Sequence, residues 1–425
     1  MQKKKILFIS DHPLSTSGVG CQARYLIEGL LRTGKYQFRC LGAAIKHGDY
    51  RIVNVPPNPN DPNRWNDGDW LIRPIDGFGD KNTMRLLLAQ EKPDAVFLFT
   101  DPRFFMHYFE IEDEIHQICP MVWWHVWDND PWPAYNKAIY DSIDLCNCHS
   151  YKTYSLVSEH YPEITNFIPH AVPPEIFYPM KEEEISLAKE NLLGAEKKDH
   201  FVALWINRNA KRKMPGDVID SWHIFLKQLE EKYGHKNATL LMHTNPLDQE
   251  GPNLYKIVEH FNLVDNVVFS TDRIGFPQVN MLHNISDTYI SISSNEGFGL
   301  GTLESMMTAT PIIALKTGGM TRQVVDHRDG SHNGIALDPE VRNLVGSQLV
   351  PYIYEDHISN QTFANAIMEM YEYGPEKRKE LGKKALDYAN YEFNLNETVE
   401  KWDKTLFETI EGWKDKRKPW ECQKL

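Results

Sequence analysis

The segment from Ser293 to Glu304 carries the residue types with the clearest chemical meaning. It reads Ser-Ser-Asn-Glu-Gly-Phe-Gly-Leu-Gly-Thr-Leu-Glu, follows an apolar run typical of a strand, and opens a helical pattern. Glycines at positions 297, 299 and 301 let backbone N–H groups approach an anion closely, and the helix adds its positive N-terminal end. The pattern predicts a diphosphate site. Glu296 and Glu304 would accept hydrogen bonds from sugar or ribose hydroxyls on either side of the phosphates. A plain strand-to-helix turn, with Glu304 complementing the helix dipole, is the alternative.

A second segment concentrates positive charge. Residues 207–213 read Asn-Arg-Asn-Ala-Lys-Arg-Lys and follow an apolar run. Cations at a strand end would neutralise a leaving diphosphate without a metal ion. Arg208 is the clearer candidate, because Lys211, Arg212 and Lys213 leave open which of them contacts phosphate. A solvated basic loop is the competing interpretation.

Two series of β-α-β alternation position these segments. Short apolar runs, typical of buried parallel strands, alternate with amphipathic segments. Each series predicts a doubly wound, Rossmann-like α/β domain. The strand candidates are Lys5–Ser10, Gln37–Gly42, Ala95–Phe99, Met121–Trp127, Leu145–Ser150 and Asn166–His170, then His200–Asn207, Ala238–Thr244, Val267–Ser270, Tyr289–Ser293 and Pro311–Leu315.

The proline-rich segment Pro169–Met180 separates the two series, since proline removes backbone donors and favours extended chain. We expect domains over residues 1–172 and 173–395, with their carboxyl strand ends facing a cleft where ligands bind. The Pro- and Asn-rich segment 51–79 suits an excursion from the sheet edge rather than another β-α unit, and its role stays open. Residues from Asn360 onward are charged and helical in pattern.

Composition narrows the class of protein. The chain has 425 residues, and 46 Lys and Arg against 59 Asp and Glu give a formal charge of −13. This balance disfavours a nucleic-acid-binding protein, whose affinity would rest on basic surface. No apolar run approaches the ~18 residues that a membrane span needs, and Ile6–Ile9 is too short for a signal-peptide core, so we expect a cytoplasmic protein. The six cysteines contain no C-x-x-C pair, which indicates neither a zinc ribbon nor a disulfide framework.

The stretch from Glu296 to Glu304 resembles the two-glutamate signature of the retaining, GT-B-fold glycosyltransferases of family 4. Pro311–Ala314 with Gly318-Gly319 is similar to the family's next strand and glycine turn, and Ser17–Gly20 to its amino-terminal glycine loop. The resemblance covers nearly the whole chain. It departs from the family at Thr308–Thr310, where a glycine is usual, and at Gly301, where a proline often stands.

The resemblance implies a GT-B hexosyltransferase that moves a sugar from a nucleotide-diphosphate donor to an acceptor hydroxyl with retention and without a metal ion. Its C-terminal helix, about 396–420, would pack back on the first, acceptor-side domain. No cofactor is implied beyond a UDP-, GDP- or ADP-sugar as co-substrate. The implied catalytic residues are Glu296, His125, Arg208 and Lys213, and the implied donor-binding residues are Gly18, Gly20, Arg208, Lys213, Arg273, Ile274, Glu296, Gly297, Phe298, Gly299, Leu300, Gly301 and Glu304.

Individual roles follow the family's motif. Glu304 falls on the ribose-binding glutamate, Glu296 on the glutamate that contacts the donor sugar, and His125 on a histidine that touches the transferred sugar. A lone histidine beside tryptophans is more often a core residue. Asp128 and Asp130 imitate the metal-binding D-x-D of the single-domain glycosyltransferase fold, but a cationic phosphate site makes a metal redundant.

Two rival functions use the same fold. One is a non-catalytic sugar-nucleotide or glycan-binding protein, which would lack the charged residues, and the other is a phosphorylase- or synthase-like enzyme. No motif names the donor base, the sugar or the oligomeric state. The acceptor, whether glycan, lipid, protein or small molecule, stays equally open.

Overall fold

The computed structural model describes residues 2–416, apart from the side chain of Lys414. Its chain forms two compact units. Of the described residues, the first contains 2–127, 131–171 and 395–416, and the second contains 128–130 and 172–394. Residues 417–420 of the expected C-terminal helix lie outside the described part of the chain.

The first unit is built on a sheet of eight strands in the order β3-β4-β2-β1-β5-β6-β7-β8. All neighbours are parallel except the short β3, which runs antiparallel to β4. Apolar runs form the strands because both faces are covered: residues 6–9 of β1 are all buried. The strands are β1 Lys4–Asp11, β2 Tyr36–Ala43, β3 Val53–Asn54, β4 Trp70–Pro74, β5 Ala95–Phe99, β6 Met121–His125, β7 Leu145–Cys148 and β8 Thr165–Phe167.

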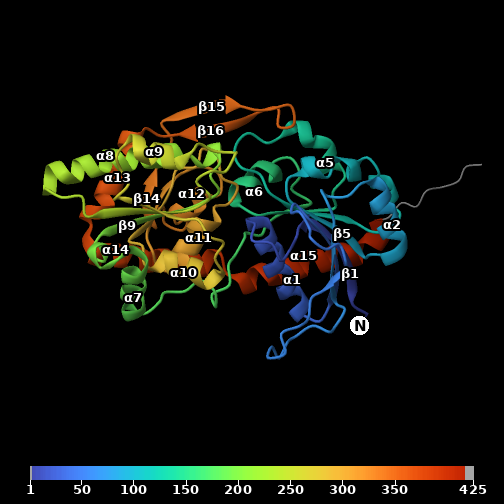
Figure 1. The fold of residues 1–425 in the computed structure, drawn as a ribbon. Helices are drawn as coiled ribbons and strands as arrows, with labels where there is room; N and C mark the ends of the chain where they lie inside the picture. Colours follow the sequence, from blue (N-terminus) through green and yellow to red (C-terminus); the bar gives the residue numbers. More distant parts are fainter. Residues whose placement is uncertain (1, 417–425) are drawn as a thin grey trace, which may run out of the picture. The chain divides into compact units, whose positions relative to one another are not determined.

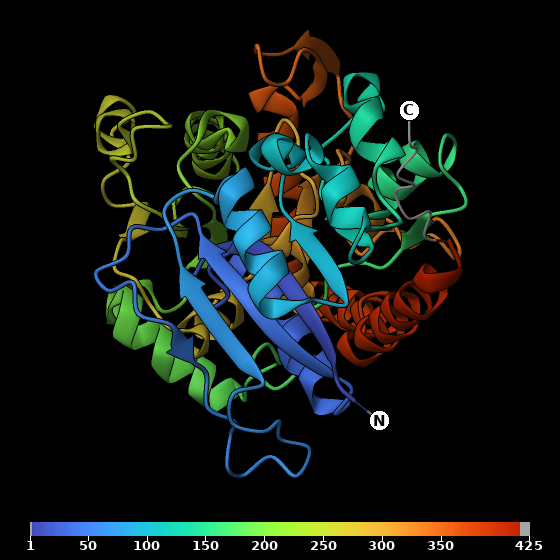
Figure 2. The ribbon, with the colours of Figure 1, turned by 90° about the vertical axis from the view of Figure 1, so that its right-hand side faces the viewer.

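Helices surround this sheet (Figures 1 and 2). The last of them, α15, joins the first unit although it comes from the far end of the sequence. Its Trp402 is fully buried and stacks on Phe97 at 4.7 Å between ring centroids. The helices are α1 Gly18–Arg32, α2 Lys81–Glu91, α3 Met106–Phe109, α4 Glu112–His116, α5 Lys137–Asp141, α6 Tyr151–Ser158 and α15 Leu395–Lys416, with 3-10 turns at Pro102–Phe104 and Ala134–Asn136.

Segment 51–79 contains a strand that the sequence analysis missed. β4 pairs in parallel with β2, and its Trp70 and Ile72 are fully buried. The flanking Pro, Asn and Asp residues hid this short alternating run. β4 and the helix α2 that follows it form a further β-α unit, so the expectation of an excursion in place of such a unit was wrong.

The second unit has a parallel six-stranded sheet in the order β11-β10-β9-β12-β13-β14. A separate antiparallel hairpin pairs β15 with β16. The strands are β9 Phe201–Ile206, β10 Ala238–His243, β11 Val267–Ser270, β12 Thr288–Ser291, β13 Ile312–Leu315, β14 Gly334–Leu337, β15 Val341–Val345 and β16 Ile353–His357. The sequence analysis expected the first five and missed β14 and the hairpin.

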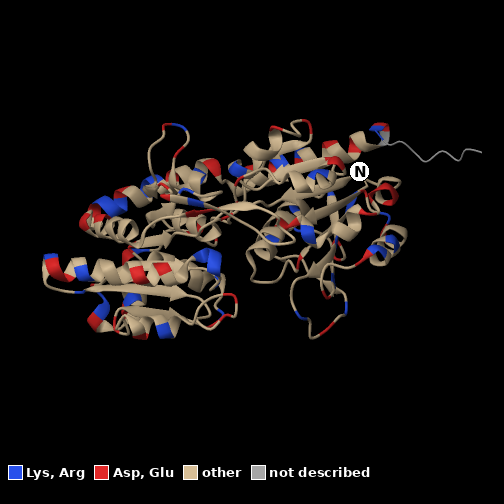
Figure 3. Ribbon diagram, turned by 90° about the horizontal axis from the view of Figure 1, so that it is seen from above, with Lys and Arg blue, Asp and Glu red and all other residues tan. Residues whose placement is uncertain are grey.

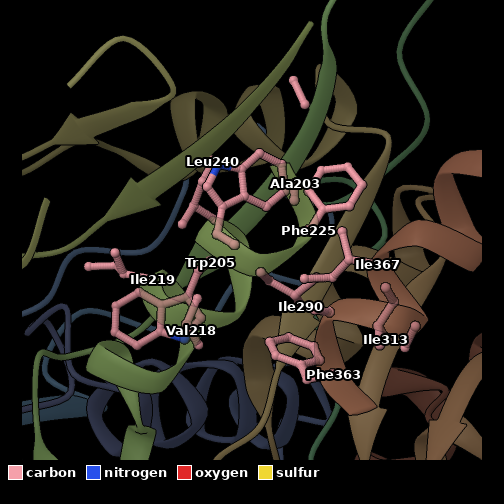
Figure 4. Close-up of a cluster of buried hydrophobic side chains, with 14 of the residues drawn as sticks. Ala203, Trp205, Val218, Ile219, Phe225, Leu240, Ile290, Ile313, Phe363 and Ile367 are labelled. Atoms are coloured by element: carbon pink, nitrogen blue, oxygen red, sulfur yellow. The ribbon is translucent and has the colours of Figure 1, made fainter. Parts of the chain in front are cut away.

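Buried side chains between this sheet and its helices form one core. Ala203, Trp205 and Leu240 of the strands meet Phe225 of α8 and residues of α13 (Figure 4). The helices of the unit are α7 Glu182–Leu193, α8 Pro215–Tyr233, α9 Leu254–His260, α10 Phe276–Asn284, α11 Leu300–Met307, α12 Met320–Val324, α13 Asn360–Glu372 and α14 Gly374–Glu392, with 3-10 turns at Ala195–Lys197 and Lys211–Lys213.

Charged residues lie mainly on the helices and connecting loops, and the strands carry few (Figure 3). Both signs are mixed along the helices, as expected for solvated faces. Among the described residues, no helix is both long and apolar enough to pass through a bilayer.

Candidate active site

The second sheet has a topological switch point between β9 and β12. Counted from β9, its strand order is the 3-2-1-4-5-6 of a dinucleotide-binding fold, so the connections leave β9 and β12 in opposite directions. The loops after these two strands, residues 207–214 and 292–299, therefore lie at the crevice where such sheets bind ligands. They carry the basic segment and the glycine-rich segment of the sequence.

Hydrogen bonds hold the two loops together. The backbone N–H of Ser294 donates to the carbonyl of Arg212 at 2.8 Å, and the Arg212 guanidinium donates to the carbonyl of Asn295 at 3.1 Å. A single 3-10 turn, Lys211–Lys213, presents the basic side chains here, and α8 begins two residues later at Pro215. The turn thus places adjacent cations against the glycine-rich loop.

Lys213 and Arg212 both approach the carboxylate of Glu296. Lys213 Nζ forms a hydrogen-bonded ion pair with Glu296 Oε2, and Arg212 Nη1 lies 3.7 Å from the same oxygen. The Asp128 carboxylate is 4.0 Å from Arg212 Nη1. Glu296 and Lys213 are nearly buried, with side chains 13% and 10% exposed. We call Lys213, Glu296, Arg212 and Asp128 the charged cluster.

The environment shifts the two cations in opposite directions. Burial lowers the pKa of Lys213, and the neighbouring Arg212 charge lowers it further against the opposing effect of Glu296. Burial would also lower the pKa of Arg212, but the carboxylates of Asp128, Glu296 and Glu355 raise it overall. Arg212 is therefore the firmly charged member of the pair.

Arg208 lies apart from the charged cluster. Its side chain is 64% exposed and forms a bidentate pair with Asp248, at 2.8 and 3.1 Å. That hydrogen-bonded pairing raises the pKa of Arg208 and lowers that of Asp248. The sequence favoured Arg208 over Arg212, whereas the structure places Arg212 beside Glu296. No signal in the sequence distinguished Arg212, because its position depends on the geometry of the turn at residues 211–213.

The glycines of the loop are required for two different reasons. Gly299 adopts a φ of +91° and directly precedes α11, without contributing a side-chain cap. A Cβ on Gly301 would lie 2.4 Å from the hydroxyl of Tyr289, so close packing requires this glycine. The first amides of α11 thus face a loop that offers no capping side chain, which is the arrangement of an anion site.

Gly318 and Gly319 pack against the backbone of the glycine-rich loop. The N–H of Gly319 donates to the carbonyl of Glu296 at 2.9 Å. A Cβ on Gly318 would lie 1.9 Å from that carbonyl oxygen and 2.3 Å from the carbonyl oxygen of Asp128. The backbone around Glu296 is therefore closely packed, and Phe298 is buried next to it.

Glu304 lies one helical turn into α11, in a different environment from Glu296. His283 Nε2 is 3.4 Å from its Oε2, and the Glu304 side chain is 18% exposed. Tyr289, which lies under Gly301, interacts electrostatically with both Glu296 and Glu304. Leu300 begins α11, and Gly297 is buried in the loop before it. Arg273 and Ile274 follow β11 and are exposed and half-buried, respectively.

Gly18 and Gly20 belong to the first unit, at the start of α1. Ser17 caps this helix by accepting from the Gly20 N–H at 3.0 Å, and it donates to Asp11 at 2.7 Å. A Cβ on Gly20 would lie 2.7 Å from the carbonyl oxygen of His12, so the turn itself requires this glycine. Burial raises the pKa of Asp11 against the opposing hydrogen bond from Ser17.

His125 ends β6 in the first unit and is fully buried. Its ring packs at a tilt against Trp123, with 3.8 Å between centroids, and Nε2 is 2.8 Å from the hydroxyl of Tyr140. Burial holds the pKa of His125 well below its usual value, with a smaller contribution from His149. The side chain is therefore a neutral imidazole packed among aromatic rings, the environment of a core histidine.

Comparison with known proteins finds a match for the part of the second unit that contains Lys213, Arg212 and Glu296. Residues 193–387 match the family of glycosyl transferases group 1. This match covers most of the second unit. A curated relative, trehalose synthase of Thermococcus litoralis, is 29% identical over 119 residues, which are 27% of this chain and 27% of that protein. Trehalose synthase of Rubrobacter xylanophilus is 25% identical over 39% of this chain and 40% of its own length.

Solved structures establish the GT-B fold for the chain. Sucrose-phosphate synthase of Thermosynechococcus elongatus aligns over 96% of this chain and 100% of its own, with a TM-score of 0.71 and 14% identity. Anabaena HepE, solved with UDP and glucose, aligns over 95% of this chain and 100% of its own, with a TM-score of 0.68 and 15% identity. The predicted fold class is thereby confirmed.

Proposed function

We propose that this protein is a glycosyltransferase that moves a sugar from a nucleotide-diphosphate donor to an acceptor hydroxyl, with retention of configuration and without a metal ion. One observation carries the proposal: in the glycosyl transferases group 1 domain, Lys213 and Arg212 converge on Glu296 at the switch point, next to the uncapped start of α11. Two cations and a helix N-terminus together suit a diphosphate.

The charges suit the leaving group of a glycosyl transfer. Negative charge grows on the diphosphate as the bond to the sugar breaks, so fixed cations and amides at that point lower the barrier. Glu296 forms an ion pair with Lys213 in the structure. A bound diphosphate would take over this cation, which frees Glu296 to accept hydrogen bonds from the donor sugar.

Retention needs no protein nucleophile in this scheme. The acceptor hydroxyl attacks the sugar on the face that the nucleotide leaves, and an oxygen of the departing phosphate takes the hydroxyl proton. Lys213 and Arg212 then stabilise the released diphosphate, and Glu304 accepts hydrogen bonds from the ribose.

The relatives favour particular substrates. HepE was solved in complex with UDP and glucose, which makes UDP-glucose the first donor to test. The curated relatives carry the name trehalose synthase, which favours a sugar as the acceptor and keeps a synthase-like reaction as the second candidate.

Thermal shift with UDP, GDP, ADP and their sugars, with and without a chelator, tests the donor site, because a ligand that binds only the folded state raises its melting temperature. We expect a selective shift that survives the chelator. Lys213→Ala should abolish it, whereas Lys211→Ala, on the exposed side of the same turn, should not. No shift from a well-folded sample would contradict the proposal.

Product analysis tests the reaction. Incubation of the responding donor with glucose or glucose 6-phosphate, followed by NMR of the product, reports both the bond formed and its anomeric configuration. An inverted product would refute retention, and activity that requires added manganese would refute metal independence.

A further inference from the structure

Asp356 is a buried carboxylate that lies outside the charged cluster but contacts the segments that form it. It belongs to β16, the second strand of the hairpin, and its side chain is fully buried. Burying a carboxylate costs free energy unless hydrogen bonds and a counter-charge satisfy it.

Three side chains from separate segments donate to this carboxylate. Asn129 Nδ2 and Thr317 Oγ1 each lie 2.7 Å from Oδ2, and Arg342 Nε lies 2.7 Å from Oδ1. The backbone N–H of Asp356 donates in turn to the carbonyl of Ser294 at 2.7 Å. The hairpin thus binds two loops of the unit and the isolated segment 128–130 at one point.

Each of these segments carries part of the charged cluster or its support. Ser294 is two residues before Glu296, Thr317 precedes the Gly318 that packs on the Glu296 carbonyl, and Asn129 follows Asp128, which faces Arg212. A second hydrogen bond joins the hairpin to segment 128–130: the Tyr354 N–H donates to the carbonyl of Asp130 at 2.8 Å.

We propose that Asp356 is a positioning residue for the donor site: its carboxylate holds Asn129 and Thr317, and through them the backbone on both sides of Glu296, in the geometry that sugar transfer requires. The proposal rests on the function proposed above. Asp356 makes no contact with the substrate in this account and acts only through its neighbours. The hairpin, a part of the fold that the sequence pattern did not reveal, thereby supports the chemistry.

Exchanging the side chains of Asp356 and Asn129 tests the positioning role directly. Asp356→Asn removes acceptor capacity that the three donors need, and Asn129→Asp places two carboxylates together, so each should lower the rate of UDP release from UDP-glucose roughly tenfold to a hundredfold. The double exchange Asp356→Asn with Asn129→Asp restores an amide donating to a carboxylate. It should recover much of the lost kcat, with a smaller effect on KM throughout.

A matched control separates positioning from stability. Asp287 accepts from the Val202 N–H and pairs with Arg378 just before β12, at the end of that strand opposite the charged cluster. Asp287→Asn should lower the melting temperature without changing kcat. Equal losses of kcat in Asp287→Asn and Asp356→Asn variants of similar stability would overturn the proposal.

Hydrogen exchange gives a readout that does not depend on activity. Asp356→Asn should speed amide exchange in residues 293–298 and 317–319 while the strand at 201–206 stays protected. Thr317→Val, which removes one donor without uncovering a charge, should do the same more weakly and serves if Asp356→Asn fails to fold. Unchanged exchange in these loops contradicts the positioning role. Absence of UDP release from the wild-type protein, with the loops loosened as expected, would contradict the proposed function instead.

Discussion

At the scale of single residues, the pairing of Lys213 with Glu296 makes the strongest prediction about turnover. Lys213→Ala should lower kcat on the order of a hundredfold to a thousandfold, the usual effect of removing one preorganised group that stabilises transition-state charge. Steady-state kinetics with the responding donor measures it. Lys211→Ala is the control, because Lys211 belongs to the same turn and is exposed.

Arg212 and Arg208 give opposed predictions. Arg212→Ala should lower kcat at least tenfold, because its guanidinium lies 3.7 Å from the Glu296 carboxylate. Arg208→Ala should lower it less, because Arg208 is bound to Asp248. A larger loss of kcat in Arg208→Ala than in Arg212→Ala would show that donor binding releases Arg208 from Asp248. Measuring kcat of Asp248→Asn in the same way would identify that release.

The proposed contact between Glu304 and the ribose can be tested with a nucleotide that lacks the ribose hydroxyls. If its carboxylate accepts from ribose hydroxyls, the wild-type protein should bind UDP about tenfold more tightly than 2′,3′-dideoxy-UDP, in line with a hydrogen bond to a charged group. Glu304→Gln should bind both with similar, weaker affinity in calorimetry. A preference that survives Glu304→Gln would remove Glu304 from the ribose.

At the scale of elements, the start of α11 is packed directly on Tyr289. Gly301→Ala improves helix propensity by about 1 kcal/mol, but its Cβ would lie 2.4 Å from the tyrosine hydroxyl. We expect overpacking to prevail and the free energy of unfolding to fall by about 1–3 kcal/mol. Tyr289→Phe in the same chain should recover part of that loss in urea titration. A stabilising Gly301→Ala would show that the helix moves away without cost.

Elements also show what sequence patterns reveal. Continuous apolar runs predicted strands such as Ala95–Phe99 and Val267–Ser270 with the bounds that the structure has. β4 escaped because polar turn residues flank Trp70 and Ile72. β15 escaped because its residues are exposed and carry no alternation between a buried and a solvated face. The spacing of apolar residues in a sequence reflects which side chains are buried. An element that buries few side chains therefore has no recognisable apolar pattern.

The charged cluster illustrates the same limit for the site. Glu296 is predicted from residue types near a strand end, whereas Lys213 is singled out from Lys211 and Arg212 only by the family resemblance. The topology places the ends of both strands at the switch point. The choice between Arg208 and Arg212 depends on the turn geometry of residues 211–213, and no spacing rule expresses it. The place of Asp128 depends on contacts between segments more than eighty residues apart in sequence.

At the scale of the whole molecule, buried histidines make folding sensitive to acid. Burial holds the pKa of His125 and His170 well below the value of about 6.5 that the unfolded chain has. Below that pH the unfolded state binds protons that the folded state refuses, so stability is lost as the pH falls. Urea unfolding at about pH 7.5 and 5 measures the loss. His125→Gln should make it smaller, and an unchanged loss would show that His125 accepts a proton in the folded protein.

His116 should change the pH dependence of stability in the opposite direction to His125. Burial alone would lower its pKa, but Asp144 and Glu112 raise it overall. Its contribution is therefore fully present below the unfolded pKa and is lost as the pH rises through the folded pKa. His116→Gln should destabilise the protein more at pH 5 than at pH 8, in the same unfolding experiment.

The first unit is assembled from the two ends of the described chain, with residues 172–394 inserted between them. During translation the ribosome therefore completes the entire second unit before it releases α15. Until then Phe97 and Trp124 lack Trp402, the ring that covers them, and the nascent first unit exposes an aromatic surface. A ribosome that stalls anywhere between Val172 and Asn394 leaves that surface open, which makes the nascent chain a target for chaperones that bind apolar segments.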